Sequence, residues 1–206
     1  MLPMPVAVVP YSVLGTQLTN SRAFEQRAEE PGPSTAFVDP AGLPYITQYG
    51  PRGAGGAAGA IYKFLGISTA ERFPEAVMAA ITAPTHAKYA TYGGGQKHAI
   101  HAVGPNFNEH ACSWEEAVEL LGCTYANVLS EFAETPASVT DLRLLPISGG
   151  IFAGPFKSRL PELTLEALAV GFSKVSAQAR QIVLGRRVQM CVFEERELES
   201  FVGAFP

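Results

Sequence analysis

The sequence lacks a surplus of positive charge and any long apolar run. Its 15 Lys and Arg residues are outnumbered by 19 Asp and Glu residues, so the formal net charge is −4. No cationic surface is therefore expected to neutralise a nucleic-acid backbone over many phosphates. No stretch approaches the eighteen consecutive apolar residues of a membrane span, and the start "MLPMPVAVVP" has no basic region of the kind that opens a signal peptide. We expect an intracellular, cytoplasmic protein with neither nucleic acid nor membrane as partner.

Cysteine is also scarce. The three residues Cys112, Cys123 and Cys191 are odd in number and lie in apolar or helical contexts. Such a set fits reduced thiols better than a disulfide framework.

Histidine and cysteine do not combine into a recognisable metal site. His98 and His101 are three residues apart in a β-rich run, and strand alternation puts them on opposite faces. His110 and Cys112 follow without the spacing of a compact zinc set. No metal and no cofactor are expected, and His101 is interpreted as a hydrogen-bonded core histidine.

The chain is rich enough in apolar residues to close one core. Its 206 residues are 47% hydrophobic and 17% charged, which predicts a single domain over residues 1–206. The polar, proline-containing run 19–34, "TNSRAFEQRAEEPGPS", predicts an exposed insertion in that domain.

Short β-rich runs alternate with helical patterns along the whole chain. This alternation predicts α/β layering, with a mixed sheet between helices. The expected strands lie at 6–9, 35–39, 87–92, 98–104, 142–148 and 188–193. The triple glycine at 93–95 is interpreted as a tight hairpin turn that needs positive φ.

Three helices are marked by caps, stripes or acidic starts. Ser113 and Glu116 form the S-x-x-E pattern of a capping box, before an apolar stripe that ends near Leu129. A second stripe predicts one helix from about Thr164 to Arg180. The acidic start of "EERELESFV" (194–202) predicts a short third helix.

Two glycine-rich stretches carry the candidate chemistry. In the first, "RGAGGAAGAIYKFLG" (52–66), a loop enters a helix whose free N–H groups and positive dipole end suit a phosphate. A packing role for these small residues remains open. A Rossmann turn is a poor fit because thirteen residues separate the strand that ends at Asp39 from this loop.

The second stretch is "LLPISGGIFAGPF" (144–156). Here Ser148, Gly149 and Gly150 follow a predicted buried strand, at the carboxyl end where α/β sheets place their ligands. Consecutive glycine amides can hold a diphosphate without a cationic side chain, while Phe152 either contacts a sugar or base or packs in the core. No G-x-S-x-G elbow surrounds Ser148, so serine-hydrolase chemistry is a poor fit.

Several segments together resemble one known family. The stretches "GGAAGAIY", "HAIHAVGPNF", "CTYANVLSEF", "LRLLPISGGIFAGP" and "VQMCVFEERELESF" follow in this order and are similar to the macro domain, the ADP-ribose-binding module. The resemblance implies a three-layer α/β/α sandwich with a mixed, mostly parallel central sheet. It also implies a ligand cleft at two loops, which gives this set of expected ligand-binding residues: Asp39, Gly55, Gly56, Ala57, Ala58, Gly59, Ser148, Gly149, Gly150, Ile151 and Phe152.

The departures from the family's pattern concern polar side chains. After the strand 35–39, macro domains carry an Asn-Ala-Ala-Asn run that positions the distal ribose, whereas this chain has Asp39-Pro40-Ala41-Gly42. Hydrolases of the family often place an acid or another polar residue where this chain has Ala58. The family's Gly-Asp pair for adenine has Pro10-Tyr11 as its counterpart here. No catalytic residue is therefore identified.

Three functions follow from this pattern. The first is binding of ADP-ribose or a related nucleotide diphosphate, free or on an ADP-ribosylated protein, with little or no hydrolase activity. The second is a degenerate macro fold that serves as a protein-interaction or structural domain. The third is an ADP-ribosyl hydrolase with atypical catalytic residues. Nothing in the sequence sets the oligomeric state.

Overall fold

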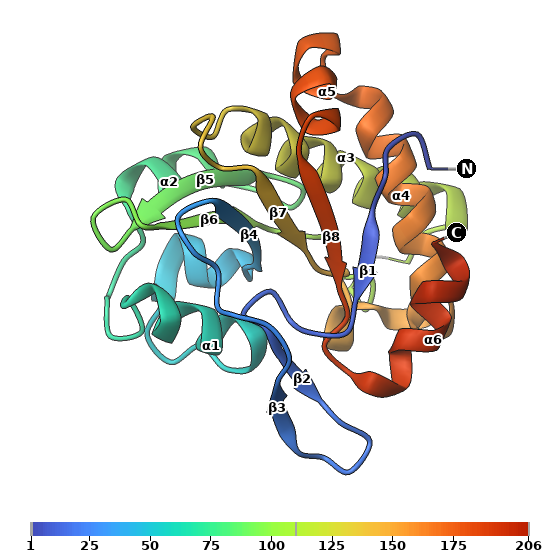
Figure 1. Cartoon of the computed structure of the whole chain (residues 1–206), viewed down its shortest axis with the longest axis horizontal. Coiled ribbons are helices and arrows are strands. Elements are labelled where there is room, and N and C mark those ends of the chain that lie inside the picture. Colours follow the sequence, from blue (N-terminus) through green and yellow to red (C-terminus); the bar gives the residue numbers. More distant parts are fainter. Residues whose placement is uncertain (1, 110, 206) are drawn as a thin grey trace.

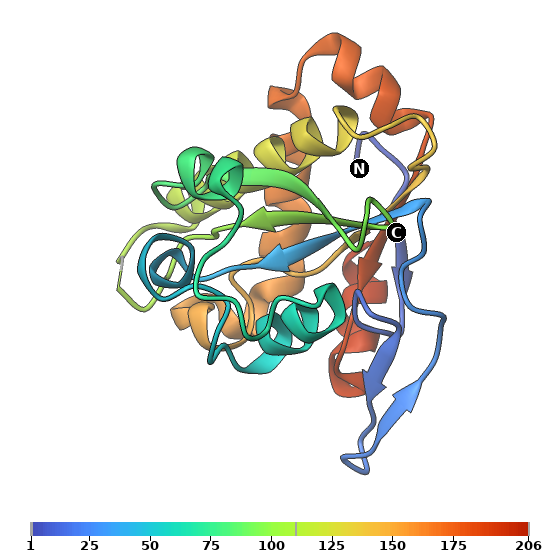
Figure 2. The same ribbon diagram turned by 90° about the vertical axis from the view of Figure 1, so that its left-hand side faces the viewer.

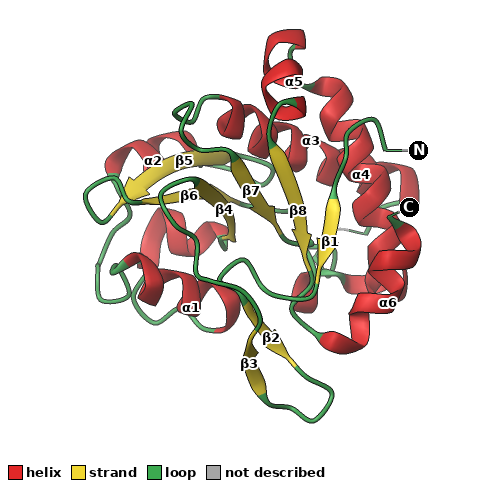
Figure 3. Cartoon of the chain, viewed as in Figure 1, coloured by secondary structure: helices red, strands yellow, loops and turns green. Residues whose placement is uncertain are grey.

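A computed structural model describes residues 2–109 and 111–205. Six strands form one central sheet in the order β1-β8-β7-β4-β6-β5, with helices on its two faces (Figures 1 and 3). Every neighbouring pair in it is parallel except β5 and β6, so the predicted mixed, mostly parallel α/β fold is confirmed. The strands are β1 (Ala7–Val9), β4 (Thr35–Pro40), β5 (Ala87–Tyr92), β6 (Lys97–Ala102), β7 (Asp141–Leu144) and β8 (Arg187–Cys191).

Two of the three predicted helices are present, the one that begins after Ser113 and the short one near the C-terminus. The third prediction, one helix at 164–180, differs from the structure. The capping box of α3 is present, because Ser113 Oγ accepts from Glu116 N at 3.2 Å and Ser113 N donates to the Glu116 carboxylate at 2.8 Å. The single helix expected at 164–180 is wrong: the chain is extended at Val175 and Ser176, and Ser176 caps a new helix. The helices are α1 (Gly56–Leu65), α2 (Glu75–Ala80), α3 (Trp114–Ala133), α4 (Leu160–Lys174), α5 (Ala177–Leu184) and α6 (Glu195–Ala204).

Alternate residues of the central strands feed two separate cores. Ala36 and Val38 of β4 point to the face covered by α3 and α4, whereas Phe37 points to the face covered by α1. Because side chains alternate along a strand, Asp39 and His101 share the α1 face. Every residue of β4 from Ala36 to Asp39 is buried, as expected for a central strand covered on both faces.

Two parts of the chain connect strands without a helix between them, the turn between β5 and β6 and a hairpin near the N-terminus. Gly93, Gly94 and Gly95 join β5 to β6 with φ of 59°, 66° and 86°, which confirms the predicted tight turn. The segment 19–34, expected to be an exposed insertion, follows β2 (Thr16–Leu18) and contains β3 (Phe24–Gln26), and these two strands form an antiparallel hairpin. Both views show this hairpin projecting beyond the sheet and its helices (Figures 1 and 2).

Candidate functional site

Helix α1 brings the first glycine-rich loop to the carboxyl edge of the sheet. Phe64, near the end of α1, packs on Phe37 with ring centroids 5.7 Å apart. Lys97, the first residue of β6, donates to the Phe64 carbonyl and lies 4.4 Å from its ring centroid. The end of α1 therefore lies toward the amino ends of the strands. Because α1 runs antiparallel to β4, its N-terminus points to the opposite edge, where β4 and β7 end.

The first turn of α1 presents unpaired backbone N–H groups. Gly55 is the N-cap and provides no side-chain acceptor. Within the described residues, the N–H groups of Gly56, Ala57 and Ala58 have no hydrogen-bond acceptor, as expected for a first helical turn. At position 59 a glycine is required by close packing, because a Cβ there would lie 2.4 Å from the Ala54 carbonyl oxygen. Residues 55–57 are exposed, and residues 58 and 59 are half-buried.

The second loop leaves β7 at the same edge. The predicted strand 142–148 stops at Leu144, and Ser148 adopts the left-handed conformation with φ 58°. Gly150 also has positive φ, 59°. The N–H groups of Gly150 and Ile151 donate to no acceptor among residues 2–109 and 111–205. Ile151 is 83% exposed and Phe152 is half-buried, so this loop also offers open amides to solvent.

The second loop crosses the end of β4 to meet the chain that follows β6. Phe107 N donates to the Phe152 carbonyl at 3.0 Å. A Cβ on Gly104 would lie 2.4 Å from Ser148 Oγ, so only glycine permits this approach. In the sheet order, β4 lies between β7 and β6. The loop therefore spans the edge toward which the N-terminus of α1 points.

Ser148 is a functional candidate whose conformation sequence reasoning missed. The residue is 4% exposed, and its hydroxyl has no hydrogen-bond partner in the described part of the chain. A buried hydroxyl without a partner costs about 1–3 kcal/mol, and the left-handed backbone of a non-glycine residue costs about 1–2 kcal/mol. Such local strain is concentrated at functional sites. The only sequence signal is that the serine stands directly before two glycines.

Asp39 departs from the set of expected ligand-binding residues. Its side chain is fully buried and its Oδ2 lies 2.7 Å from His101 Nδ1. His101 Nε2 in turn pairs with the Tyr92 hydroxyl at 2.6 Å. The carboxylate thus faces the interior beneath α1 rather than the surface of the sheet edge. Asp39 is a core residue in this structure, and His101 has the core role that the sequence indicated.

The environment of Asp39 is tightly packed and aromatic. The ring of Phe73 meets the His101 ring at 5.2 Å in an edge-on arrangement. Burial, and then the negative charge of Asp39, raises the pKa of the nearby Tyr62 hydroxyl. Neither Tyr62 Oη nor Asp39 Oδ1 has a hydrogen bond of normal geometry among the described residues. This arrangement excludes solvent from the carboxylate.

In the described part of the chain, no lysine or arginine side chain forms an ion pair or a hydrogen bond with Gly55–Gly59 or Ser148–Phe152. Arg52 precedes the first loop, but its side chain is 71% exposed and lies 4.0 Å from Glu71. An anion at these loops would therefore be held by backbone dipoles. No cluster of three or more His, Cys, Asp or Glu side chains suited to a metal ion occurs in the described ranges. No helix among them is long and apolar enough to cross a membrane.

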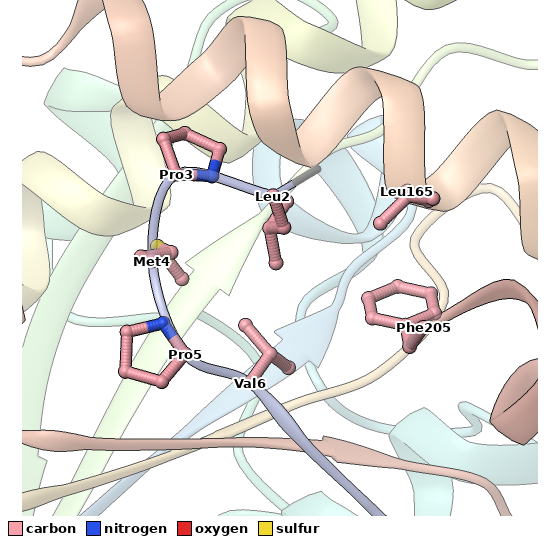
Figure 4. Close-up of a pocket in the computed structure, with 7 residues that line it drawn as sticks. All are labelled: Leu2, Pro3, Met4, Pro5, Val6, Leu165 and Phe205. Atoms are coloured by element: carbon pink, nitrogen blue, oxygen red, sulfur yellow. The ribbon is translucent and has the colours of Figure 1, made fainter.

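A separate pocket of about 230 Å³ lies beside the N-terminal segment (Figure 4). All of its lining side chains are apolar, so it does not suit a diphosphate. The lining residues are Leu2, Pro3, Met4, Pro5, Val6, Leu165 and Phe205.

Comparison with solved structures identifies similar folds. A structure of the Oceanobacillus iheyensis macrodomain with ADP is 17% identical, with a TM-score of 0.57, and covers 96% of this chain and 87% of that one. A substituted form of that macrodomain with ADPR is 17% identical, with a TM-score of 0.52, over 82% of this chain and 83% of that one. An alphavirus P23pro-zbd structure is 22% identical, with a TM-score of 0.54, over 82% of this chain. The match spans only 21% of that longer chain.

Comparison of the sequence with protein families and curated proteins finds no match. At these identities, the structural likenesses show the fold alone.

Proposed function

From the macro-domain-like fold of this chain, we propose that its residues form one domain that binds ADP-ribose or a related nucleotide diphosphate. The diphosphate would lie between the first turn of α1, at Gly55–Gly59, and the loop Ser148–Phe152. The observation that carries the proposal is the presence of unpaired, exposed backbone N–H groups in both loops at one edge of the sheet. Backbone amides and a helix dipole hold phosphate without a cationic side chain.

The proposed binding is weak because polar contacts typical of the family are missing. Asp39 is buried, and Pro40, Ala41 and Gly42 offer no side-chain polar group to a ribose. Two lost hydrogen bonds to charged groups remove about 3–6 kcal/mol. A ligand of about micromolar affinity, which corresponds to about 8 kcal/mol, would then bind at about 100 μM or more weakly.

The same residues argue against efficient hydrolysis. Ala58 stands where hydrolases of the family often have a polar residue, and a methyl group cannot orient a water molecule or accept a proton. The nearest histidine–carboxylate pair, His101 with Asp39, is closed off in the core. Incubation with an ADP-ribosylated protein is expected to release no ADP-ribose above the uncatalysed rate. Efficient release would support the atypical hydrolase instead.

A second candidate function is a protein-interaction or structural domain that no longer binds nucleotide. The observation that favours it is the burial of Asp39, which leaves the end of β4 without an exposed polar side chain. Isothermal titration with ADP-ribose, ADP and AMP separates the two functions. Saturable heat below about 1 mM ADP-ribose supports the nucleotide binder, and no heat with any of the three supports the interaction domain.

A further inference from the structure

The β2–β3 hairpin is held firmly although it projects from the body of the protein. Near its turn, Leu18 N donates to the Phe193 carbonyl at 2.9 Å, and Asn20 N donates to the Glu195 carboxylate at 2.7 Å. Arg143 donates to the Val13 carbonyl at 3.1 Å and to the Glu29 carbonyl at 2.9 Å, on either side of the hairpin. An isolated two-stranded hairpin is only marginally stable in water, so these contacts fix its position.

The outer edge of β3 is open for pairing. Thr19 N donates to the Ala23 carbonyl and Arg27 N donates to the Gly15 carbonyl, which makes these two pairs the hydrogen-bonded ones. Because antiparallel pairs alternate, the N–H and C=O groups of Phe24 and Gln26 point away from β2. All three residues of β3 are exposed, and no other described strand pairs with this edge.

The charged side chains along this edge would complement those of a second copy of the same edge. Glu25 and Arg27 lie on one face of the hairpin, where their side chains form an ion pair at 2.7 Å and are 45% and 42% exposed. If the segment is aligned antiparallel with itself about Gln26, Glu25 stands opposite Arg27 at two symmetric places. Each opposed pair thus joins charges of opposite sign.

We propose that β3 pairs antiparallel with β3 of a second copy of this chain, across a two-fold axis through Gln26. Gln26 would then exchange main-chain hydrogen bonds with the partner's Gln26, and Glu25 would face the partner's Arg27. These charged residues would occupy the pairs without mutual hydrogen bonds, where opposed side chains approach most closely. Such an interface uses the same surface on both copies, as two-fold dimers do.

The exposed aromatic group on the hairpin gives this interface its apolar contact. Phe24 is 73% exposed, and its ring rests on Phe193 at 6.0 Å. In the proposed alignment, Phe24 faces the partner's Ala28 and loses part of its contact with water. The strand is only three residues long, so the buried area is small and the dimer is weak, with a dissociation constant on the order of 100 μM.

Charge reversal tests the proposal by sedimentation velocity over 10 to about 1,000 μM protein. The wild type should dimerise with rising concentration. Glu25→Arg places arginine opposite the partner's Arg27, and Arg27→Glu places glutamate opposite the partner's Glu25. Each variant alone should associate at least about tenfold more weakly than the wild type. An equimolar mixture of the two should dimerise, and the double exchange Glu25→Arg with Arg27→Glu should restore the homodimer.

Two further variants separate pairing from general charge effects. Gln26→Pro removes an outward N–H that the hairpin does not use itself, and should abolish dimerisation while circular dichroism stays that of the wild type. Glu119→Arg reverses an exposed charge on α3, where Glu119 pairs with Lys174, and should leave association unchanged. A wild type that stays monomeric at about 1 mM overturns the proposal. So do single reversals that dimerise like the wild type. Neither result depends on whether the chain binds nucleotide.

Discussion

Asp39 and His101 are bound to each other across two adjacent parallel strands, at the end where a ligand site was expected. They are register partners in β4 and β6, their side chains are fully buried, and the Oδ2 to Nδ1 distance is 2.7 Å. The pair joins the middle of the sheet to β5 through Tyr92. The carboxylate thus has a structural role beneath the edge that carries the two glycine loops.

Removal of this carboxylate should destabilise the fold. Asp39→Ala leaves the buried His101 ring without its hydrogen-bond partner, and a buried polar group left without a partner costs about 1–3 kcal/mol. Tyr92→Phe removes only the far hydrogen bond and should cost about 1 kcal/mol. Urea unfolding followed by circular dichroism measures both changes. Glu119→Ala, which breaks an exposed ion pair with Lys174, is the control and should change stability by less than about 1 kcal/mol. A similarly small effect of Asp39→Ala would contradict the structural role.

Stability should fall on mild acidification because of His98. Burial lowers the pKa of His98 below its ordinary value of 6.5, while a hydrogen bond to the Pro33 backbone acts in the opposite direction. The folded state then binds fewer protons than the unfolded state. The contribution of neutral, buried His98 to the free energy of unfolding is therefore fully present above about pH 6.5. It is lost as the pH falls through the lower pKa that His98 has in the folded state.

The measurement for His98 is the free energy of unfolding in urea at closely spaced pH values from 7.5 to 4.5. His98→Gln should flatten the curve just below about pH 6.5 relative to the wild type. His86→Gln, at a half-buried histidine outside the strands, serves as the matched control. Identical curves for wild type and His98→Gln would show that this histidine contributes nothing.

Local patterns in the sequence predicted much of the fold. The capping box at Ser113 and the triple glycine at 93–95 depend on neighbours in sequence, and both are present as expected. The helix break at Ser176 was also a local signal, since serine before "AQAR" is a good N-cap, but the longer apolar stripe concealed it.

The placement of Asp39 could not be read from the sequence in this way. Its partner His101 is 62 residues away, and the burial of both depends on how α1 covers the sheet. Ser148, whose backbone is strained, likewise lies against a residue distant in the sequence, since a Cβ on Gly104 would be 2.4 Å from its Oγ. The burial of Asp39 and the surroundings of Ser148 depend on contacts between residues distant in the sequence. Residue patterns therefore predicted where the two glycine-rich loops lie in the sequence, but not which side chains point toward them.

Gly150→Glu should abolish ADP-ribose binding while the protein stays folded. A Cβ at Gly150 would meet no atom within 4 Å, so the side chain extends into the proposed phosphate site and its charge repels a diphosphate. The positive φ costs about 1–2 kcal/mol for a side chain. Gly94→Glu is the matched control, because Gly94 has φ 66° and equally open surroundings in the β5–β6 turn. Isothermal titration should show at least tenfold weaker binding for Gly150→Glu only; unchanged affinity in both would contradict the proposed site.

Ser148→Gly should make the protein more stable and a poorer nucleotide binder. Glycine relieves the left-handed backbone at φ 58° and removes a buried hydroxyl without a partner, against a larger entropy loss on folding. The net gain should be about 1–2 kcal/mol in urea unfolding, whereas Ser148→Ala keeps the backbone strain and should gain less. A bond from this hydroxyl to a phosphate oxygen corresponds to about tenfold in affinity, which both variants should lose in titration with ADP-ribose. Higher stability with unchanged affinity would show that the hydroxyl does not contact the ligand.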